Sequence, residues 1–192
     1  MQSPKTIYLA SSSPRRVSIL KQFGYDVRIT QHHFDETSLS PHDFNSYRLY
    51  VKEIAKQKAL SANHQSKDFL LAADTIVVFN KHIFGKPTNF QEAVSYLSCL
   101  QGNIHSVISA FCLILPQSKH IILKSSLSYV RFNPLSTSQI ESYIKTYKPF
   151  DKAGAYGIQE CPSYFIDSYT GSIYTIIGLP IYLLNKTIKD SH

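Results

Sequence analysis

The chain has 192 residues, of which 43% are hydrophobic and 17% are charged, a composition typical of a folded globular protein and unlike that of a disordered one. Its formal net charge of +7 at pH 7 favours polyanionic partners, such as a nucleotide, nucleic acid or an acidic membrane surface, without choosing among them. No apolar run approaches the ~18 residues that a membrane-spanning helix needs. The three widely spaced cysteines form no CxxC pair, which indicates reduced thiols rather than a disulfide framework or a zinc site. Because the first residues lack the pattern of a secretory signal, we expect a cytoplasmic protein.

Residues 11–16, between the first predicted strand and helix, have the features of an anion-binding site. Apolar residues 7–10 predict a short strand, and a helical pattern that ends at Gly24 follows residues 11–16, SSSPRR. A helix N-terminus flanked by serine hydroxyls and two arginines suits phosphate oxygens. The same six residues also fit an ordinary capped helix with solvated arginines, so they do not decide the function alone.

A second strand, predicted at 26–30, runs into the polar stretch QHHFDE at 31–36. Two adjacent histidines near two carboxylates suggest a metal cluster, but neighbours in an extended chain point to opposite faces and seldom ligate one ion together. We therefore favour a single carboxylate, from Asp35 or Glu36, turned into a cleft.

An aspartate interrupts the most apolar strand of the sequence. A helix is predicted over 43–63, and residues 69–79, FLLAADTIVVF, predict a buried strand. Asp74 in such a strand is costly unless it is paired, ligates a metal or faces water. The alternative is a strand edge or bulge that leaves Asp74 in solvent.

Two further loops carry lysines. A short strand at 82–84 ends in Gly85-Lys86-Pro87, and residues 149–159, PFDKAGAYGIQ, contain small residues, a lysine and an amide. Small residues let the backbone approach a ligand closely, although a tight structural loop has the same composition. The other predicted elements are helices at 90–100, after Ser136 and up to about Lys189, and strands at 104–115, 120–132 and 164–167.

Four stretches together resemble the Maf family of nucleoside triphosphate pyrophosphatases. They are LASSSPRR at 9–16, AADTIV at 72–77, GKP at 85–87 and DKAGAYGIQ at 151–159. The resemblance covers nearly the whole chain. It implies an α/β fold related to that of inosine triphosphate pyrophosphatases: a long twisted mixed β-sheet flanked by helices. It also implies one domain over 1–192 with two lobes around a central cleft, and a homodimer.

The same resemblance implies cleavage between the α and β phosphates of a nucleoside triphosphate with a divalent metal, Mg²⁺ or Mn²⁺, and a link to septum formation and division arrest. Asp74 then accepts a proton from the attacking water, and Asp74 and Glu36 are the expected metal ligands, with Lys86 as a further catalytic residue. The expected substrate-binding residues are Ser11, Ser13, Arg15, Arg16, Lys58, Thr75, Lys152 and Gln159.

The base is indicated by three positions that match the dTTP/UTP subgroup of that family: Arg15, Thr75 and Gln159. A glutamine carboxamide offers a donor and an acceptor, which match the O4 and N3–H groups of uracil or thymine, whereas guanine favours a glutamate. We therefore predict dTTP and UTP as substrates, with a 7-methyl-GTP pyrophosphatase as the alternative. Asn103 replaces a frequent arginine of the family, and residues 160–162, Glu-Cys-Pro, replace the usual glycines beside the base pocket.

The alternative from another class is a binding protein that docks nucleic acid or a division protein without catalysis. The basic, tyrosine-rich composition fits such a role. However, the cationic residues gather in the phosphate motifs rather than in a basic run, and Asp74 would then have no function. We therefore expect a nucleotide substrate, with neither nucleic acid nor a membrane as partner. An inosine or xanthosine triphosphate pyrophosphatase would need a purine-selective pocket, for which the sequence has no motif.

Overall fold

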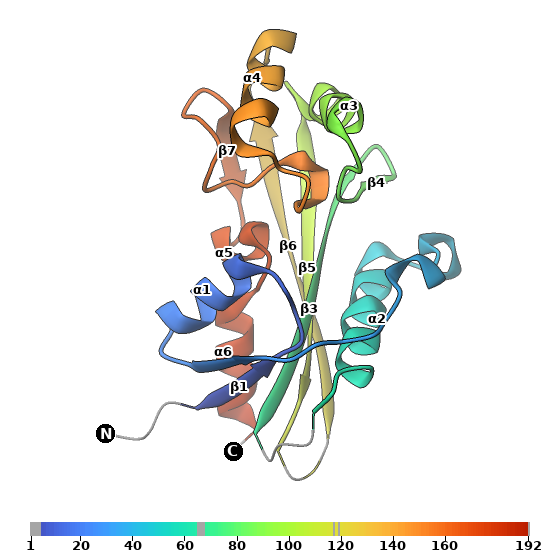
Figure 1. The fold of residues 1–192 in the computed structure, drawn as a ribbon, viewed down its shortest axis with the longest axis vertical. Coiled ribbons are helices and arrows are strands. Elements are labelled where there is room, and N and C mark those ends of the chain that lie inside the picture. The colour runs from blue at the N-terminus through green and yellow to red at the C-terminus, as the bar shows by residue number, and fades with distance from the viewer. Residues whose placement is uncertain (1–4, 65–67, 117, 119, 192) are drawn as a thin grey trace. The chain divides into compact units, whose positions relative to one another are not determined.

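The computed structural model describes residues 5–64, 68–116, 118 and 120–191, and within them it has a seven-stranded mixed β-sheet flanked by helices (Figure 1). The strands are β1 (Thr6–Leu9), β2 (Asp26–Ile29), β3 (Phe69–Phe79), β4 (His82–Phe84), β5 (Ile104–Ile114), β6 (Ile121–Phe132) and β7 (Ile166–Thr170). The α-helices are α1 (Pro14–Gln22), α2 (Tyr47–Leu60), α3 (Phe90–Leu100), α4 (Thr137–Tyr147), α5 (Ile173–Ile177) and α6 (Ile181–Asp190). Short 3₁₀ turns are η1 (Glu36–Ser38), η2 (Pro41–Asp43) and η3 (Ala153–Ala155). The predicted α/β class with a mixed sheet is confirmed.

The strand order is β2-β1-β3-β5-β6-β7, and β4 pairs with β3. β1 runs parallel to β2 and β3, whereas β4 and β7 are antiparallel to β3 and β6. In the β1–β3 register Leu9 lies opposite Leu71, and Ala10 N donates to Leu71 O at 2.8 Å. Because these strands are parallel, the loop that leaves β1 runs beside the part of β3 that contains Asp74.

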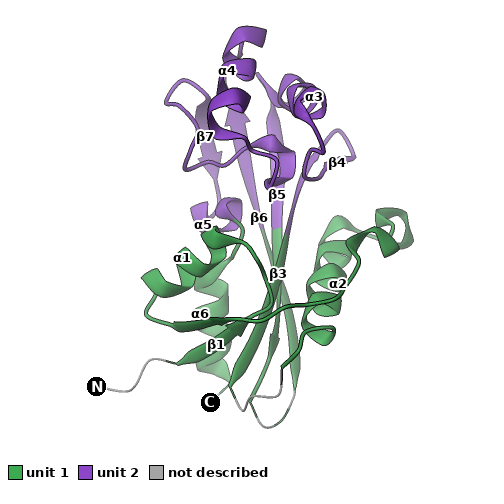
Figure 2. Ribbon diagram, viewed as in Figure 1, with its two compact units in different colours: residues 1–74, 109–126, 178–192 green, residues 75–108, 127–177 purple. Residues whose placement is uncertain are grey.

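The chain divides into two compact units, coloured separately in Figure 2. Unit 1 comprises residues 1–74, 109–126 and 178–192, and unit 2 comprises 75–108 and 127–177. Along the chain, the first boundary lies within β3, between Asp74 and Thr75. The expected central cleft stays a prediction.

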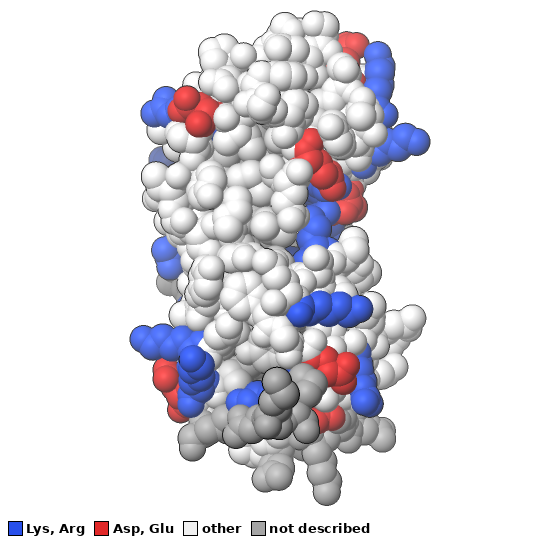
Figure 3. All heavy atoms as spheres, turned by 90° about the vertical axis from the view of Figure 1, so that its left-hand side faces the viewer, with Lys and Arg blue, Asp and Glu red and all other residues white. Residues whose placement is uncertain are grey.

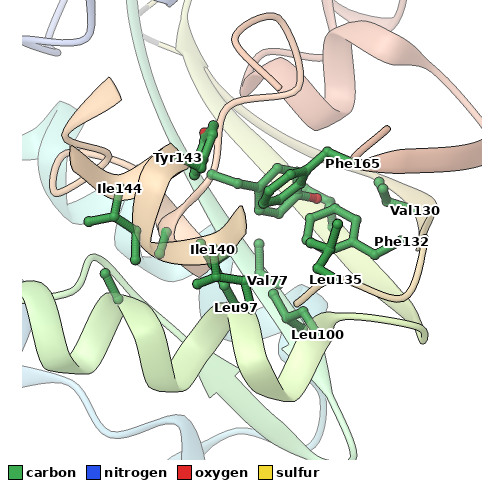
Figure 4. Close-up of a cluster of buried hydrophobic side chains, with 14 of the residues drawn as sticks. Val77, Leu97, Leu100, Val130, Phe132, Leu135, Ile140, Tyr143, Ile144 and Phe165 are labelled. Carbon is green, nitrogen blue, oxygen red and sulfur yellow. The ribbon is translucent and has the colours of Figure 1, made fainter. Parts of the chain in front are cut away.

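Each unit has its own apolar cluster. In unit 1, small residues of α2 and β3 pack together, among them Ala55, Ala59 and Ala72. In unit 2, side chains of α3 and α4 meet the aromatic rings of Phe132, Tyr143 and Phe165 (Figure 4). The Phe165 ring centroid lies 5.2 Å from that of Phe132 and 4.7 Å from that of Tyr143, distances at which aromatic pairs attract one another.

Most predicted elements are confirmed within one or two residues, and the start of α2 differs most. The helix expected from residue 43 begins at Tyr47, because Pro41–Asp43 form the turn η2 and Ser46 Oγ accepts the Leu49 N–H at 3.3 Å as a helix cap. The strand expected at 164–167 is β7, which begins at Ile166 and extends to Thr170. Among the described helices, none has the length and apolar character needed to cross a membrane.

Candidate active site

Asp74 lies in the buried strand β3, in the part that belongs to unit 1, and is paired with a lysine. Its exposed fraction is 7%, and its Oδ1 lies 2.7 Å from Nζ of Lys58, which is itself 4% exposed. A buried charge requires such a partner, because burial of a lone ion costs several kcal/mol. The alternative of Asp74 in solvent at a strand edge is therefore wrong.

Glu36 brings a second carboxylate to the same lysine. Its Oε1 lies 2.7 Å from Lys58 Nζ. The neighbouring Asp35 is instead occupied by its own turn, since its Oδ1 accepts from the hydroxyl of Thr37 at 2.7 Å and from the Thr37 N–H at 2.9 Å. These two hydrogen bonds lower the pKa of Asp35. Of the two carboxylates that the sequence left open, Glu36 is thus the one that joins Asp74.

Lys58 reaches this position because it lies on the buried face of α2. The buried residues of that helix are Val51, Ile54, Ala55, Lys58 and Ala59. Lysines on an amphipathic helix are usually solvated, and only the family resemblance marks Lys58 as functional. A second signal is present in the sequence: Lys58 lies four residues after Ile54 and three after Ala55, which is the spacing of one helix face.

Arg16 at the start of α1 is held by two oxygens of unit 1. Its Nε donates to Gly178 O at 3.0 Å, and its Nη1 donates to Ser11 Oγ at 2.9 Å. Burial lowers the pKa of Arg16, while the negative charges of Asp74 and Glu36 raise it. The guanidinium is therefore oriented before any ligand binds. Sequence reasoning missed the Gly178 carbonyl, because it lies outside the four stretches that carry the family resemblance.

The serines before α1 differ from the expected helix cap. Ser13 occupies the N-cap position, but its side chain makes no capping hydrogen bond. Its backbone N–H donates to Ser11 Oγ at 3.2 Å, so the buried Ser11 hydroxyl contacts both the start of the helix and Arg16. Arg15 is partly buried, and its positive charge contributes to the lowered pKa of Arg16.

The remaining predicted site residues belong to unit 2. The GKP and DKAGAYGIQ motifs meet there, since Gly154 N donates to Gly85 O at 3.0 Å. Lys152 is buried, and its Nζ lies 2.8 Å from Asp151 Oδ1 and 3.1 Å from Glu160 Oε2. The other three differ in exposure: Thr75 is partly buried, and Lys86 and Gln159 are exposed.

Comparison with known proteins assigns the chain to a family. The family model described as Maf-like protein matches residues 6–191. The chain belongs to the Maf family. A dTTP/UTP pyrophosphatase of Clostridium perfringens is 37% identical over 187 residues, and that of Clostridium novyi is also 37% identical over 187, in each case 96% of both chains. The dTTP/UTP pyrophosphatase of Clostridium botulinum is 37% identical over 190 residues, 97% of both chains.

A solved structure, that of the Staphylococcus aureus Ham1 protein, matches this Maf protein with a TM-score of 0.43. The two sequences are 14% identical, and the match covers 67% of this chain and 72% of the other.

Two carboxylates of this Maf protein, Asp74 and Glu36, offer oxygen atoms of the kind that a divalent cation prefers. No three His, Cys, Asp or Glu side chains of the described residues form a group that could hold a metal by themselves. Asp74 and Glu36 nevertheless converge on one point, each 2.7 Å from Lys58 Nζ. Mg²⁺ in nucleotide sites is commonly held by one or two carboxylates together with phosphate oxygens and water, and this pair provides that number.

Proposed function

We propose that the protein hydrolyses dTTP and UTP to the nucleoside monophosphate and pyrophosphate. The observation that carries the proposal is the cluster of the buried Asp74 and Lys58 with Glu36, which interacts with the oriented guanidinium of Arg16. The similarity to dTTP/UTP pyrophosphatases over nearly the full length of both chains supports the choice of substrate. A site with two carboxylates and an arginine suits a reaction in which water attacks a highly charged phosphate chain.

In this mechanism Asp74 accepts a proton from the water that attacks the α-phosphorus. The bond between that phosphorus and the oxygen bridging to the β-phosphate breaks, and pyrophosphate leaves with the electron pair of that bond. Lys58 fixes the orientation of the Asp74 carboxylate through the 2.7 Å contact, so the base is in place before the substrate arrives.

The cationic residues of the motifs are the groups that we assign to the phosphates. Ser11 and Arg16 bind phosphate oxygens, with Ser13 and Arg15 at the start of α1, and the family resemblance also assigns Lys86 and Lys152 to the phosphates. Asp74 and Glu36 would hold Mg²⁺ or Mn²⁺, which when bound neutralises phosphate charge. These assignments stay predictions.

Gln159 is the residue that we assign to base recognition, together with Arg15 and Thr75. Gln159 is exposed, so its carboxamide is accessible to a ligand. One carboxamide donor and one acceptor match the O4 and N3–H groups shared by uracil and thymine, which explains why a single enzyme would accept both dTTP and UTP.

The first test is Asp74→Asn, which keeps the shape of the side chain and removes its ability to accept a proton. We expect kcat for dTTP to fall by about 10³-fold. Glu53→Gln is the matched control, because Glu53 is a carboxylate of α2 that pairs with Lys56 at 3.3 Å instead of with Lys58. The kcat of the Glu53→Gln variant is expected to stay unchanged. Full turnover by a folded Asp74→Asn variant would contradict the assignment.

The same variant separates catalysis from a binding role. If the protein arrests cell division and that arrest depends on hydrolysis, Asp74→Asn abolishes the arrest, whereas a binding protein would retain it. In the view of Figure 3, the described Lys and Arg side chains lie beside Asp and Glu in several places, separated by uncharged surface, so this face shows no continuous basic patch for nucleic acid. A homodimer acting on the cytoplasmic nucleotide pool is what we expect.

A further inference from the structure

Lys152 of unit 2 is enclosed by two carboxylates of different exposure. Its side chain is 8% exposed, and that of Asp151, 2.8 Å away, is 55% exposed. Glu160 is 37% exposed as a side chain, but the Oε2 atom that faces Lys152 is buried. Water therefore screens the contact with Asp151 more than the contact with Glu160.

A tight turn places Glu160 over this lysine. The N–H groups of Glu160 and Cys161 donate to Gly157 O at 2.9 and 3.1 Å. Gly157 N donates to the Tyr143 hydroxyl at 3.1 Å, so α4 fixes the start of the turn. With its backbone held in this way, Glu160 is directed back towards Lys152.

Gly157 lies directly against the Lys152 and Glu160 side chains. A Cβ at this position would lie 2.9 Å from Lys152 Cε and 3.2 Å from Glu160 Oε2, and contacts below 3.0 Å force atoms apart. The side chains of Lys152 and Glu160 therefore meet beside Gly157, which has no side chain to separate them.

The contact between Glu160 and Lys152 is one that another anion can replace. Oε2 lies 3.1 Å from Nζ, yet it has no hydrogen-bond partner in suitable geometry. Charge attraction alone thus holds a buried oxygen whose hydrogen bonding is unsatisfied. The group of Lys152, Asp151 and Glu160 has a formal charge of −1, which repels a phosphate chain that approaches Lys152.

We propose that Glu160 competes with the phosphate chain of the nucleotide for the ammonium of Lys152, and so sets the affinity for the substrate. Glu160 is then a positioning residue that restrains Lys152 in the free protein and gives way to phosphate oxygens on binding. This inference rests on the proposed function, because it takes Lys152 as a substrate-binding group.

The test compares steady-state kinetics with dTTP and Mg²⁺ for the wild type and Glu160→Gln. We expect KM to fall about fivefold, the size of a partly exposed ion pair, with kcat unchanged. Glu141→Gln is the control, because it removes one negative charge from another ion pair of unit 2, with Lys145 at 3.4 Å, and should leave KM unchanged. A KM for Glu160→Gln that is equal to or higher than that of the wild type overturns the proposal.

The Lys152→Met background distinguishes competition from a merely structural role. There Glu160→Gln is expected to have no effect on KM, and an equal decrease in both backgrounds overturns the proposal. Glu160→Ser removes the same charge with a shorter side chain, and it replaces Glu160→Gln if that variant melts below the assay temperature.

Calorimetry with inorganic tripolyphosphate separates this inference from the proposed function, because it needs no turnover. Tighter binding to Glu160→Gln than to the wild type supports the competition even if no nucleotide is hydrolysed. Equal or weaker binding overturns it even if dTTP is hydrolysed as proposed.

Discussion

Lys58 is the residue that makes the buried carboxylate of Asp74 possible in this protein. Its ammonium lies 2.7 Å from both Asp74 and Glu36, and it is 4% exposed. Such an arrangement is stable only as a set, because loss of one partner leaves an uncompensated charge in a poorly solvated place. Lys58 therefore contributes to the stability of unit 1 and to the geometry of the site at once.

Replacement of Lys58 by Met is expected to lower the free energy of unfolding by about 3 kcal/mol at pH 7, since Asp74 and Glu36 then lose the counter-ion that contacts them both. Urea unfolding measures this loss. Lys56→Met on the same helix breaks a partly exposed ion pair with Glu53 at 3.3 Å and should cost less than about 1 kcal/mol. Equal losses of stability in the two variants would show that the contacts of Lys58 contribute no more than a partly exposed ion pair.

At this scale the sequence predicted Asp74 and left its partner open. A carboxylate inside an apolar strand needs a counter-charge, and the apolar residues around Asp74 at 69–79 already indicate this need. The sequence does not show which residue provides this counter-charge, because Lys58 precedes Asp74 by 16 residues and only the packing of α2 brings them together. The same holds for Arg16 and Gly178, which are 162 residues apart.

At the scale of elements, helix α4 supports the loop that carries the last motif. Its Tyr143 is 1% exposed, and its hydroxyl accepts the Gly157 N–H at 3.1 Å. Burial raises the pKa of Tyr143, so the hydroxyl stays protonated. The helix itself is anchored by a capping box, in which Ser136 and Gln139 satisfy each other's backbone N–H groups.

Tyr143→Phe is expected to lower the free energy of unfolding by about 1–3 kcal/mol, because it leaves the buried Gly157 N–H without an acceptor. Chemical denaturation of the variant measures the loss. Tyr147→Phe, one turn further along α4 and 40% exposed, is the matched control and should change the stability by less than about 0.5 kcal/mol. A Tyr143→Phe variant as stable as the control would show that Tyr143 of α4 does not stabilise this loop.

Local sequence predicted these elements well because their signals are short-range. The bounds of β3, β4 and α3 agree with the predictions, and Ser136 caps α4 as expected. The start of α2 was wrong because the Pro41–Asp43 turn interrupts an otherwise helical pattern. The register that aligns Leu9 with Leu71 depends on a long-range pairing, which no local pattern contains.

At the scale of the whole molecule, the motifs divide between the two units. The carboxylate cluster, Ser11 and Arg16 belong to unit 1, and the residues from Thr75 to Gln159 that the motifs contain belong to unit 2. The order of the motifs in the sequence predicted the family, which the comparisons confirm, but not this division. The division follows from strands such as β3, whose residues belong to both units.

The stability of the molecule should depend on pH through His105. This residue is 2% exposed, its Nε2 lies 2.8 Å from the Tyr156 hydroxyl, and its Nδ1 has no hydrogen-bond partner. Burial lowers the pKa of His105 from 6.5 to about 4. In the unfolded chain the ring takes up a proton below pH 6.5, whereas in the folded chain it stays neutral down to about pH 4, so acid favours unfolding.

We expect this histidine to remove about 3 kcal/mol of stability as the pH falls from 6.5 to 4. Urea unfolding of the wild type and of His105→Gln across this range isolates the contribution, because the other titrating groups cancel in the difference. Parallel pH profiles for the two proteins would contradict a buried neutral His105.

The central claim is the reaction, and pyrophosphate release tests it most directly. The substrates are dTTP, UTP, CTP, ATP, GTP and 7-methyl-GTP, each with Mg²⁺ or Mn²⁺ and with Asp74→Asn as the blank. We predict selective turnover of dTTP and UTP. Preferred turnover of 7-methyl-GTP would contradict the role given to Gln159, and no turnover by folded protein would contradict the proposed function itself.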